Sequence, residues 1–426
     1  MPGAFAPSLV ADAVRLGTWV PFNRIPALLH GFVGTWLSEP TVRRLTEVAG
    51  AAYVDVQAAA VAHLEHLEQS AEASLAPPVG PAVLQVSVDG AMVPLRGKGE
   101  WAEVKTLALG RVAATADGPT TVELSYFSRR ADHETFTRLA TVETHRRGVE
   151  TAGTVCGVVD GAEWCQQFFD VHRPDAVRIL DFSHAAGYLA QIGQAAFGPG
   201  TAAAATWYEA QRHALKHDPT PDGVLAAVRA VRNEVATRPA GAAGPAGATT
   251  VAAPVAALDT VTKSLTYLEK RRDHLQYAAF QQRGYPIGSG IVESANKLVV
   301  EARLKGAGMH WAPAHVDPMV ALRTVVCADR WDEAWPQICA HLRQQLRQHH
   351  RTAAAQRRAA RLAHSRASLA TPPTSCTPPP TPPPAPPPHA PLSYGPGRPA
   401  PDHPWKRARF LLPSRRTLAT AGDAKL

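Results

Sequence analysis

Three short apolar segments of the sequence finish in an aspartate. They are VSVDG, GVVDG and RILDFSH, which end at Asp89, Asp160 and Asp181. Apolar, β-branched runs of this length predict strands, and strand ends in α/β sheets are where ligand groups gather. Carboxylates brought together repel one another unless a cation lies between them, and Mg²⁺ prefers oxygen ligands. The pattern therefore predicts a divalent-metal site, although Asp-Gly after a strand is also a common turn without function.

A further carboxylate occurs early in the segment YPIGSGIVESANKLVVEARLKGAGMHW, residues 285–311. A Gly-Ser-Gly turn leads into a predicted helix in which Glu293 is followed by an amide and three cations, Asn296, Lys297, Arg303 and Lys305. One interpretation is a surface helix with ordinary i,i+4 pairing. The other is a metal-ligating carboxylate beside a phosphate-binding face, since two metal ions can hold the attacking and leaving oxygens of a phosphodiester.

Residues 82–198 predict the elements that would position these groups. Apolar runs predict three strands, and they are followed by a helix, a strand ending at Asp160, a helix, a strand ending at Asp181, and a helix that stops at Gly198. This β-β-β-α-β-α-β-α order predicts a mixed α/β layer architecture.

Composition divides the chain into five regions. We expect a helical N-terminal region at residues 1–77, the first part of the core at 78–199 and a helical insertion at 200–283. The last part of the core follows at 284–350, and a disordered, Pro-rich basic tail at 351–426. The formal net charge is +8, residues 341–426 carry +12, and the rest of the chain therefore carries −4. A basic tail indicates loose affinity for a polyanion, or a solvated segment without a partner.

The remaining composition excludes several classes of protein. The five cysteines form no C-x-x-C pair, which argues against a zinc site or a disulfide framework and fits a reducing cytoplasm. No apolar run reaches the roughly 18 residues that span a bilayer, and the N-terminus lacks the pattern of a signal peptide. We therefore expect a cytoplasmic protein with no membrane partner.

The segment GSGIVESANKLVVEARLKGAGMHW resembles the signature of the ISKra-type DDE transposases, a family of bacterial insertion-sequence transposases. Further segments resemble the family in the same order: VSVDGAMVPLRGKGEWAEVKTLALG, LSYFSR, VVDGAEWCQQFF, ILDFSHAAGYLAQIG and HPWKR. The resemblance covers residues 82–335 well and 18–50 moderately. It implies a ribonuclease-H-like mixed sheet with a helical insertion before a catalytic glutamate.

The resemblance also implies roles for single residues. Asp89, Asp160 and Glu293 would be the catalytic triad and would hold two Mg²⁺ or Mn²⁺ ions. Asp181 and His184 resemble a D-x-x-H motif that lies near the active site in related transposases, and Asn296 would lie one turn beyond Glu293. An alternative makes Asp181 the second catalytic aspartate; we prefer Asp160, because it ends the fourth strand of the sheet.

The expected partner is DNA, both the terminal inverted repeats of the element and the target. Lys297, Arg303 and Lys305 would contact phosphates, which positions DNA without reading its sequence; a solvated helix face is the alternative. His310 and Trp311 could meet an unpaired base or serve in packing. Residues 20–50 resemble a helix-turn-helix that would expose Arg43 and Arg44 to the major groove. Family members usually have more sequence before this segment, so we expect a shortened N-terminus.

The expected activity is Mg²⁺-dependent DNA cleavage and strand transfer at the element ends, by a homodimer on paired ends in the nucleoid. An alternative is a decayed or repurposed transposase that binds DNA without catalysis. A third is a scaffold protein whose Pro-rich tail recruits partners, which leaves the ordered motifs unexplained.

Overall fold

A computed structural model describes residues 5–70, 78–97, 99–116, 118–238 and 253–370 of the chain. The chain divides into two units, Met1–Ala354 and Ala355–Leu426, and all that follows concerns the first unit except the end of the last helix. Among the described residues, no helix is both long enough and apolar enough to cross a membrane.

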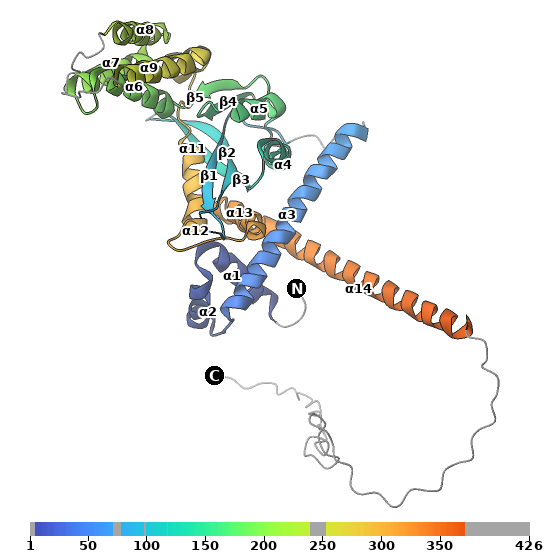
Figure 1. Ribbon diagram of the computed structural model, residues 1–426. Helices are drawn as coiled ribbons and strands as arrows, with labels where there is room; N and C mark the ends of the chain where they lie inside the picture. Colours follow the sequence, from blue (N-terminus) through green and yellow to red (C-terminus); the bar gives the residue numbers. More distant parts are fainter. Residues whose placement is uncertain (1–4, 71–77, 98, 117, 239–252, 371–426) are drawn as a thin grey trace, which may run out of the picture. The chain divides into compact units, whose positions relative to one another are not determined.

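A five-stranded mixed sheet lies at the centre of the first unit (Figure 1), with the strand order β3-β2-β1-β4-β5. The central strand β1 pairs antiparallel with β2 and parallel with β4; β2–β3 is antiparallel and β4–β5 is parallel. The strands are β1 (Val83–Pro94), β2 (Trp101–Thr115), β3 (Gly118–Arg129), β4 (Thr154–Val159) and β5 (Val177–Leu180). The predicted mixed α/β class and the predicted order of elements are confirmed.

Helices precede, interrupt and follow the sheet. The N-terminal ones are α1 (Pro7–Trp19), η1 (Phe22–Arg24), α2 (Ile25–Val33) and α3 (Glu39–Ser70). Between and after the strands lie α4 (His133–Arg146), α5 (Glu163–His172), α6 (Phe182–Phe197), α7 (Ala202–His217), α8 (Asp222–Thr237), α9 (Ala253–Lys270), η2 (Arg272–Leu275) and α10 (Tyr277–Gln282). The last are α11 (Gly290–Ala295), the π-helical turn η3 (Asn296–Glu301), α12 (Ala302–Leu304), α13 (Pro313–Cys327) and α14 (Trp331–Ala370).

The period-2 alternation of β1 assigns its side chains to two separate cores. Leu84, Val86 and Val88 pack in the core that contains Phe136 of α4 and Phe168 of α5. The alternate positions point to the opposite face, where Ala91 and Val93 pack with residues of α11, η3 and α13 in a second core. Helices α6, α8 and α9 share a third core with β4 and β5. The sheet is therefore covered on both faces.

The N-terminal helices share a core with the end of the first unit. Leu9 of α1, Leu45 of α3, Leu322 of α13 and Ile338 of α14 belong to one buried cluster. The helix, turn, helix predicted at residues 20–50 is confirmed as α2, a turn and α3, with Gly34 ending α2 at a left-handed φ of 67°. The second helix is 32 residues long, because its apolar stripe continues along α13.

One expectation about the tail is wrong. Residues 351–370, which we expected to be disordered, form the last half of α14. The reason is composition: this stretch is rich in Ala and Arg, which are good helix formers, and the Pro-rich run begins only after it. Residues 371–426, including the Pro-rich run and HPWKR, lie outside the described residues.

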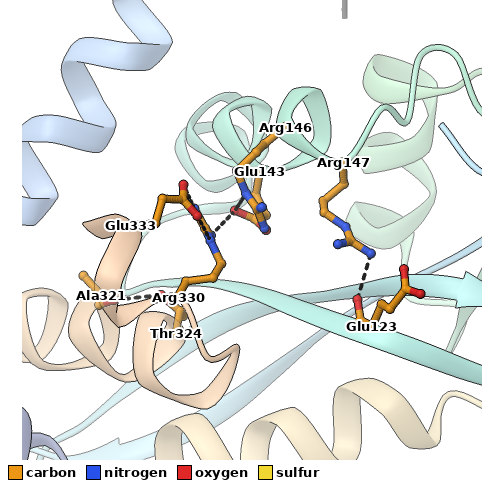
Figure 2. Close-up of polar contacts among 8 residues, drawn as sticks. All are labelled: Glu123, Glu143, Arg146, Arg147, Ala321, Thr324, Arg330 and Glu333. Carbon is orange, nitrogen blue, oxygen red and sulfur yellow. Dashed lines mark hydrogen bonds and ion pairs between the residues drawn. The ribbon is translucent and has the colours of Figure 1, made fainter. Parts of the chain in front are cut away.

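A buried carboxylate links α4 to the start of α14. Figure 2 shows Glu143 between Arg146 and Arg330, with Arg330 also held by Glu333. The Glu143 side chain is 2% exposed, and its Oε2 accepts from Arg330 Nη1 at 3.0 Å. Burial acts to lower the pKa of Arg330, but the hydrogen bond to Glu333 and the charge of Glu143 raise it above its ordinary value. The guanidinium therefore stays charged and keeps Glu143 paired.

We expect Glu143→Gln to lower the free energy of unfolding by about 3 kcal/mol, because removing one partner of a buried ion pair leaves the other charges uncompensated. Urea unfolding measures the change. The control is Glu209→Gln, which removes an exposed pair with Arg212 and should cost far less, because exposed ion pairs are screened by solvent. Equal effects of the two substitutions would show that burial of Glu143 contributes nothing.

Candidate active site

The parallel register brings the three aspartates into one row. Val86 of β1 lies opposite Gly157 of β4, and Val159 of β4 lies opposite Leu180 of β5. Continuing these registers by three residues and by one places Asp89 opposite Asp160 and Asp160 opposite Asp181. The hydrogen-bonded pairing of β1 with β4 itself ends at Val86 and Gly157, so the three aspartates occupy corresponding positions of β1, β4 and β5.

Asp89 is not at the end of its strand, which corrects one expectation. Its strand continues to Pro94, because β2 supplies an antiparallel partner along the whole length and pairs Asp89 with Thr106. The other two aspartates do follow strand ends, since β4 ends at Val159 and β5 ends at Leu180. Asp89 is thus held within a strand that is paired with β2 at this position, whereas Asp160 begins a turn.

Buried polar side chains on β2 and β3 continue the row of aspartates across the sheet. Thr106 of β2 pairs in register with Ser128 of β3, and their hydroxyls are 3.1 Å apart. Gln85 and Ser87 precede Asp89 at alternate positions, on the same side of β1, and Gln85 Nε2 donates to Gly288 O at 2.9 Å. Our sequence reasoning missed these residues. Their signal is the alternation Gln-x-Ser-x-Asp inside an apolar strand.

The helix after the Gly-Ser-Gly turn brings Glu293 and Asn296 to Asp89. Asn296 is the first residue of the π-helical turn η3, and its Nδ2 donates to Asp89 Oδ2 at 2.8 Å. The other amide atom, Asn296 Oδ1, is buried and has no hydrogen-bond partner in the described structure. Glu293 lies one turn earlier and is exposed, with Oε1 3.5 Å from Ser289 Oγ. An unpartnered buried acceptor beside a carboxylate suits a donor or cation.

Electrostatic coupling joins the three predicted triad residues. Burial raises the pKa of Asp89, and the negative charges of Asp160 and Glu293 raise it further, whereas hydrogen bonds from Gly90 and Asn296 act in the opposite direction. Both neighbouring carboxylates must therefore lie close enough to repel the charge on Asp89. Perturbed carboxylates of this kind are typical of functional sites.

Asp160 and Asp181 differ in how their oxygens are used. Asp160 Oδ1 accepts from Ala162 N at 2.9 Å and lies 3.6 Å from Cys165 Sγ. Asp181 is buried, and both of its oxygens accept from backbone amides: Oδ2 from His184 N at 2.8 Å and Oδ1 from Ser289 N at 2.7 Å. Asp181 therefore caps α6 and ties it to the turn that begins α11. The His184 ring is exposed and lies against Tyr188 and Tyr267.

The predicted phosphate-binding cations are not equivalent. Lys297 is exposed. Lys305 makes an i,i+4 ion pair with Glu301 at 2.6 Å, as the surface-helix interpretation proposed. Arg303 is 2% exposed; burial lowers its pKa to about 10, and its Nε donates to Gly17 O at 3.1 Å. Arg303 thus supports packing, and its charge is not presented to a phosphate.

His310 and Trp311 also differ in exposure. His310 is exposed. Trp311 is 8% exposed, its Nε1 donates to Leu304 O at 3.2 Å, and its backbone pairs with Leu95 beyond the end of β1. Trp311 therefore has the packing role that we gave as one of its two alternatives.

Both predicted cations of the N-terminal region are exposed on α3. Arg43 pairs with Glu39 and stacks over Phe22. Arg44 lines a cavity of about 920 Å³ together with apolar residues of α1, α3 and α14, including Leu45, Val48 and Trp335. Neither lies in the carboxylate row, and contact with DNA would be separate from it.

The residue types around Asp89 suit a hard divalent cation. The charges of Asp160 and Glu293 act on Asp89, the Asn296 Nδ2 donates to it, and the buried Asn296 Oδ1 has no partner in the described structure. These side chains nevertheless do not form a closed metal site. Within the described residues, no three His, Cys, Asp or Glu side chains stand together as a ready metal-ligand group. The exposed Glu293 is the member of the triad whose side chain is least constrained.

Comparison with known proteins adds no assignment. No protein-family model matches the chain, and no curated protein is significantly similar to it. The argument for function therefore depends on the residues and their geometry.

We expect Asp89→Asn to raise the melting temperature at pH 7. The folded-state pKa of Asp89 lies above the ordinary value of 3.8, so folding is penalised once the pH exceeds the folded pKa, and the penalty vanishes as pH falls to the ordinary value. The new amide removes the repulsion, and the unpartnered Asn296 Oδ1 can accept from it. The stabilisation should shrink between pH 7 and pH 4, which thermal scans across this range measure.

Mg²⁺ should raise the melting temperature of the wild type, because a ligand that binds only the folded state stabilises it, and it should raise that of Asp89→Asn less. Asp175→Asn is the control: a hydrogen bond from Arg173 lowers the pKa of that exposed carboxyl, so its removal should not stabilise. Equal Mg²⁺ responses in wild type and Asp89→Asn would place the metal elsewhere.

Proposed function

We propose that this chain is a DDE-type transposase of the ISKra type, which cleaves DNA at the ends of an insertion sequence and joins them to a target. The observation that carries the proposal is the hydrogen bond from Asn296, on the helical segment after Glu293, to Asp89 of β1. The charges of Asp160 and Glu293, which both raise the pKa of Asp89, support it. The resemblance assigned the same three residues to the catalytic triad. The element order and the sheet order agree with a ribonuclease-H-like core, which is part of the proposal.

Asp89, Asp160 and Glu293 would hold two Mg²⁺ or Mn²⁺ ions, which when bound polarise the phosphodiester and activate water or a 3′-hydroxyl. The protein supplies orientation. Asp89 is held by Gly90 N and Asn296 Nδ2, and Asp160 by Ala162 N. We keep Asp160 as the second catalytic aspartate, because its charge acts on Asp89, whereas Asp181 caps α6 and ties it to the turn before α11.

The proposed partner is DNA, with a homodimer on paired element ends. Within the candidate set, the exposed groups that could contact it are Lys297, Lys305, His310, Arg43 and Arg44. Arg303 and Trp311 are withdrawn from the set because both are buried.

A second candidate is a decayed transposase that binds DNA without cutting it. The observation in its favour is the lack, among the described residues, of a ready group of three metal-ligating side chains. Both candidate functions predict DNA binding, but only the active transposase predicts DNA cleavage.

The test is Mg²⁺-dependent cleavage of DNA carrying the sequences that flank the gene. Asp160→Asn and Glu293→Gln should each lose cleavage by about 1,000-fold or more, because metal ions stabilise the transition state by several kcal/mol. DNA affinity should stay unchanged in gel-shift titrations. Asp170→Asn is the matched control, since this exposed carboxyl pairs with Arg178 away from the row.

Three outcomes separate the assignments. Cleavage retained in Glu293→Gln would refute the triad. Loss in Asp181→Asn with full activity in Asp160→Asn would move the second catalytic aspartate to Asp181. Wild-type binding without cleavage would favour the decayed transposase.

A further inference from the structure

The C-terminal end of α9 contacts the turn that follows β4. The Tyr267 hydroxyl donates a short hydrogen bond to Asp160 O. Arg271 Nε and Nη2 both donate to Gly161 O, at 3.1 and 2.6 Å. These donors come from the helical insertion, more than 100 residues further along the chain. Figure 1 shows α6 to α9 grouped beyond the β5 edge of the sheet.

The two donor side chains are held against each other. The Arg271 guanidinium lies 3.7 Å from the centre of the Tyr267 ring, and its Nη1 donates to Tyr267 O at 3.2 Å. Tyr188 of α6 stacks on Tyr267, with ring centres 4.1 Å apart and planes at 22°. Burial raises the pKa of Tyr267, so the hydroxyl keeps its proton and remains a donor.

The turn itself is shaped to receive these donors. Gly161 has φ of 85°, in the left-handed region that favours glycine. A Cβ at Gly161 would lie 2.5 Å from the Tyr267 hydroxyl and 2.6 Å from Arg271 Nε. The next amide, Ala162 N, donates to Asp160 Oδ1. The path of the turn therefore determines where the Asp160 carboxylate points.

We propose that Tyr267 and Arg271 are positioning residues: by holding the carbonyls of Asp160 and Gly161, the helical insertion aims the Asp160 carboxylate at Asp89. The catalytic meaning of this role depends on the proposed function, but the positioning itself does not. Neither residue touches the reacting atoms. The insertion would then be part of the active-site machinery and more than a peripheral addition to the core.

The alternative is that α9 only packs. Val261, Leu265 and Leu268 of α9 are buried in the core shared with α6 and α8. This packing holds the helix regardless of the polar contacts, so Tyr267→Phe should remove one hydrogen bond without unfolding the protein. Tyr188→Phe is the matched control, because it deletes a hydroxyl from the neighbouring ring of the same stack.

The first measurement is hydrogen exchange of the full chain at the Ala162 amide, whose hydrogen bond reports the orientation of Asp160. Tyr267→Phe should speed exchange about five- to tenfold, the effect of losing one hydrogen bond, and Tyr188→Phe should not. Arg271→Gln should act like Tyr267→Phe, and Arg271→Lys, which keeps a donor, should restore part of the protection. Equal exchange in Tyr267→Phe and Tyr188→Phe overturns the proposal.

The second measurement is the Mg²⁺ concentration that gives half-maximal cleavage. It should rise about five- to tenfold in Tyr267→Phe, for the same loss of one hydrogen bond, while DNA affinity and melting temperature match those of Tyr188→Phe. An unchanged Mg²⁺ requirement with faster exchange overturns the catalytic part of the role. A wild type that cuts no DNA overturns the proposed function alone, since the exchange measurement still decides whether α9 positions the turn.

Discussion

The register of β1, β4 and β5 is the constraint on which the site depends. Parallel pairing sets Asp89, Asp160 and Asp181 at corresponding positions of the three strands, and carboxylates brought together repel one another. The surrounding structure supplies hydrogen-bond donors to each carboxylate: a backbone amide and the Asn296 amide for Asp89, one amide for Asp160, and two for Asp181. The fold around this edge of the sheet is therefore organised to hold negative charge.

The three aspartates differ in what their hydrogen bonds connect. Asp181 has both oxygens engaged and connects α6 with the turn before α11. Asp89 retains an unfavourable charge environment even with its donors, since burial, Asp160 and Glu293 all raise its pKa. A carboxylate that destabilises the folded state for want of a counter-charge is what a cation-binding site requires.

Segments that are distant in the sequence contact the aspartates of this candidate site. Helix α11 and the π-helical turn η3 bring the amide of Asn296 to Asp89 from one side, and π-helical turns are frequent at functional sites. Helix α9 reaches the turn after Asp160 from the other side through Tyr267 and Arg271. The predicted helical insertion is thereby tied to the turn that carries Asp160.

The buried arginines show that a charged residue in the sequence need not place its charge at the protein surface. Arg303 stacks between Phe22 and Trp311, and Arg323 donates to the carbonyls of Thr18 and Val299. Both guanidiniums join the N-terminal helices to the segments after the sheet by satisfying backbone carbonyls. The buried Glu143–Arg330 pair links α4 to α14 in a comparable way.

The order of strands and helices was determined by the sequence alone, because alternating apolar residues, Gly and Pro turns and the helix stop at Gly198 act locally. The same local signals placed Asp160 and Asp181 at strand ends. Tertiary structure decided the rest. Pairing with β2 carried β1 past Asp89, packing against Phe22 buried Arg303, and docking of α9 joined Tyr267 to Asp160. These outcomes depend on contacts between residues far apart in the chain, which no local pattern encodes.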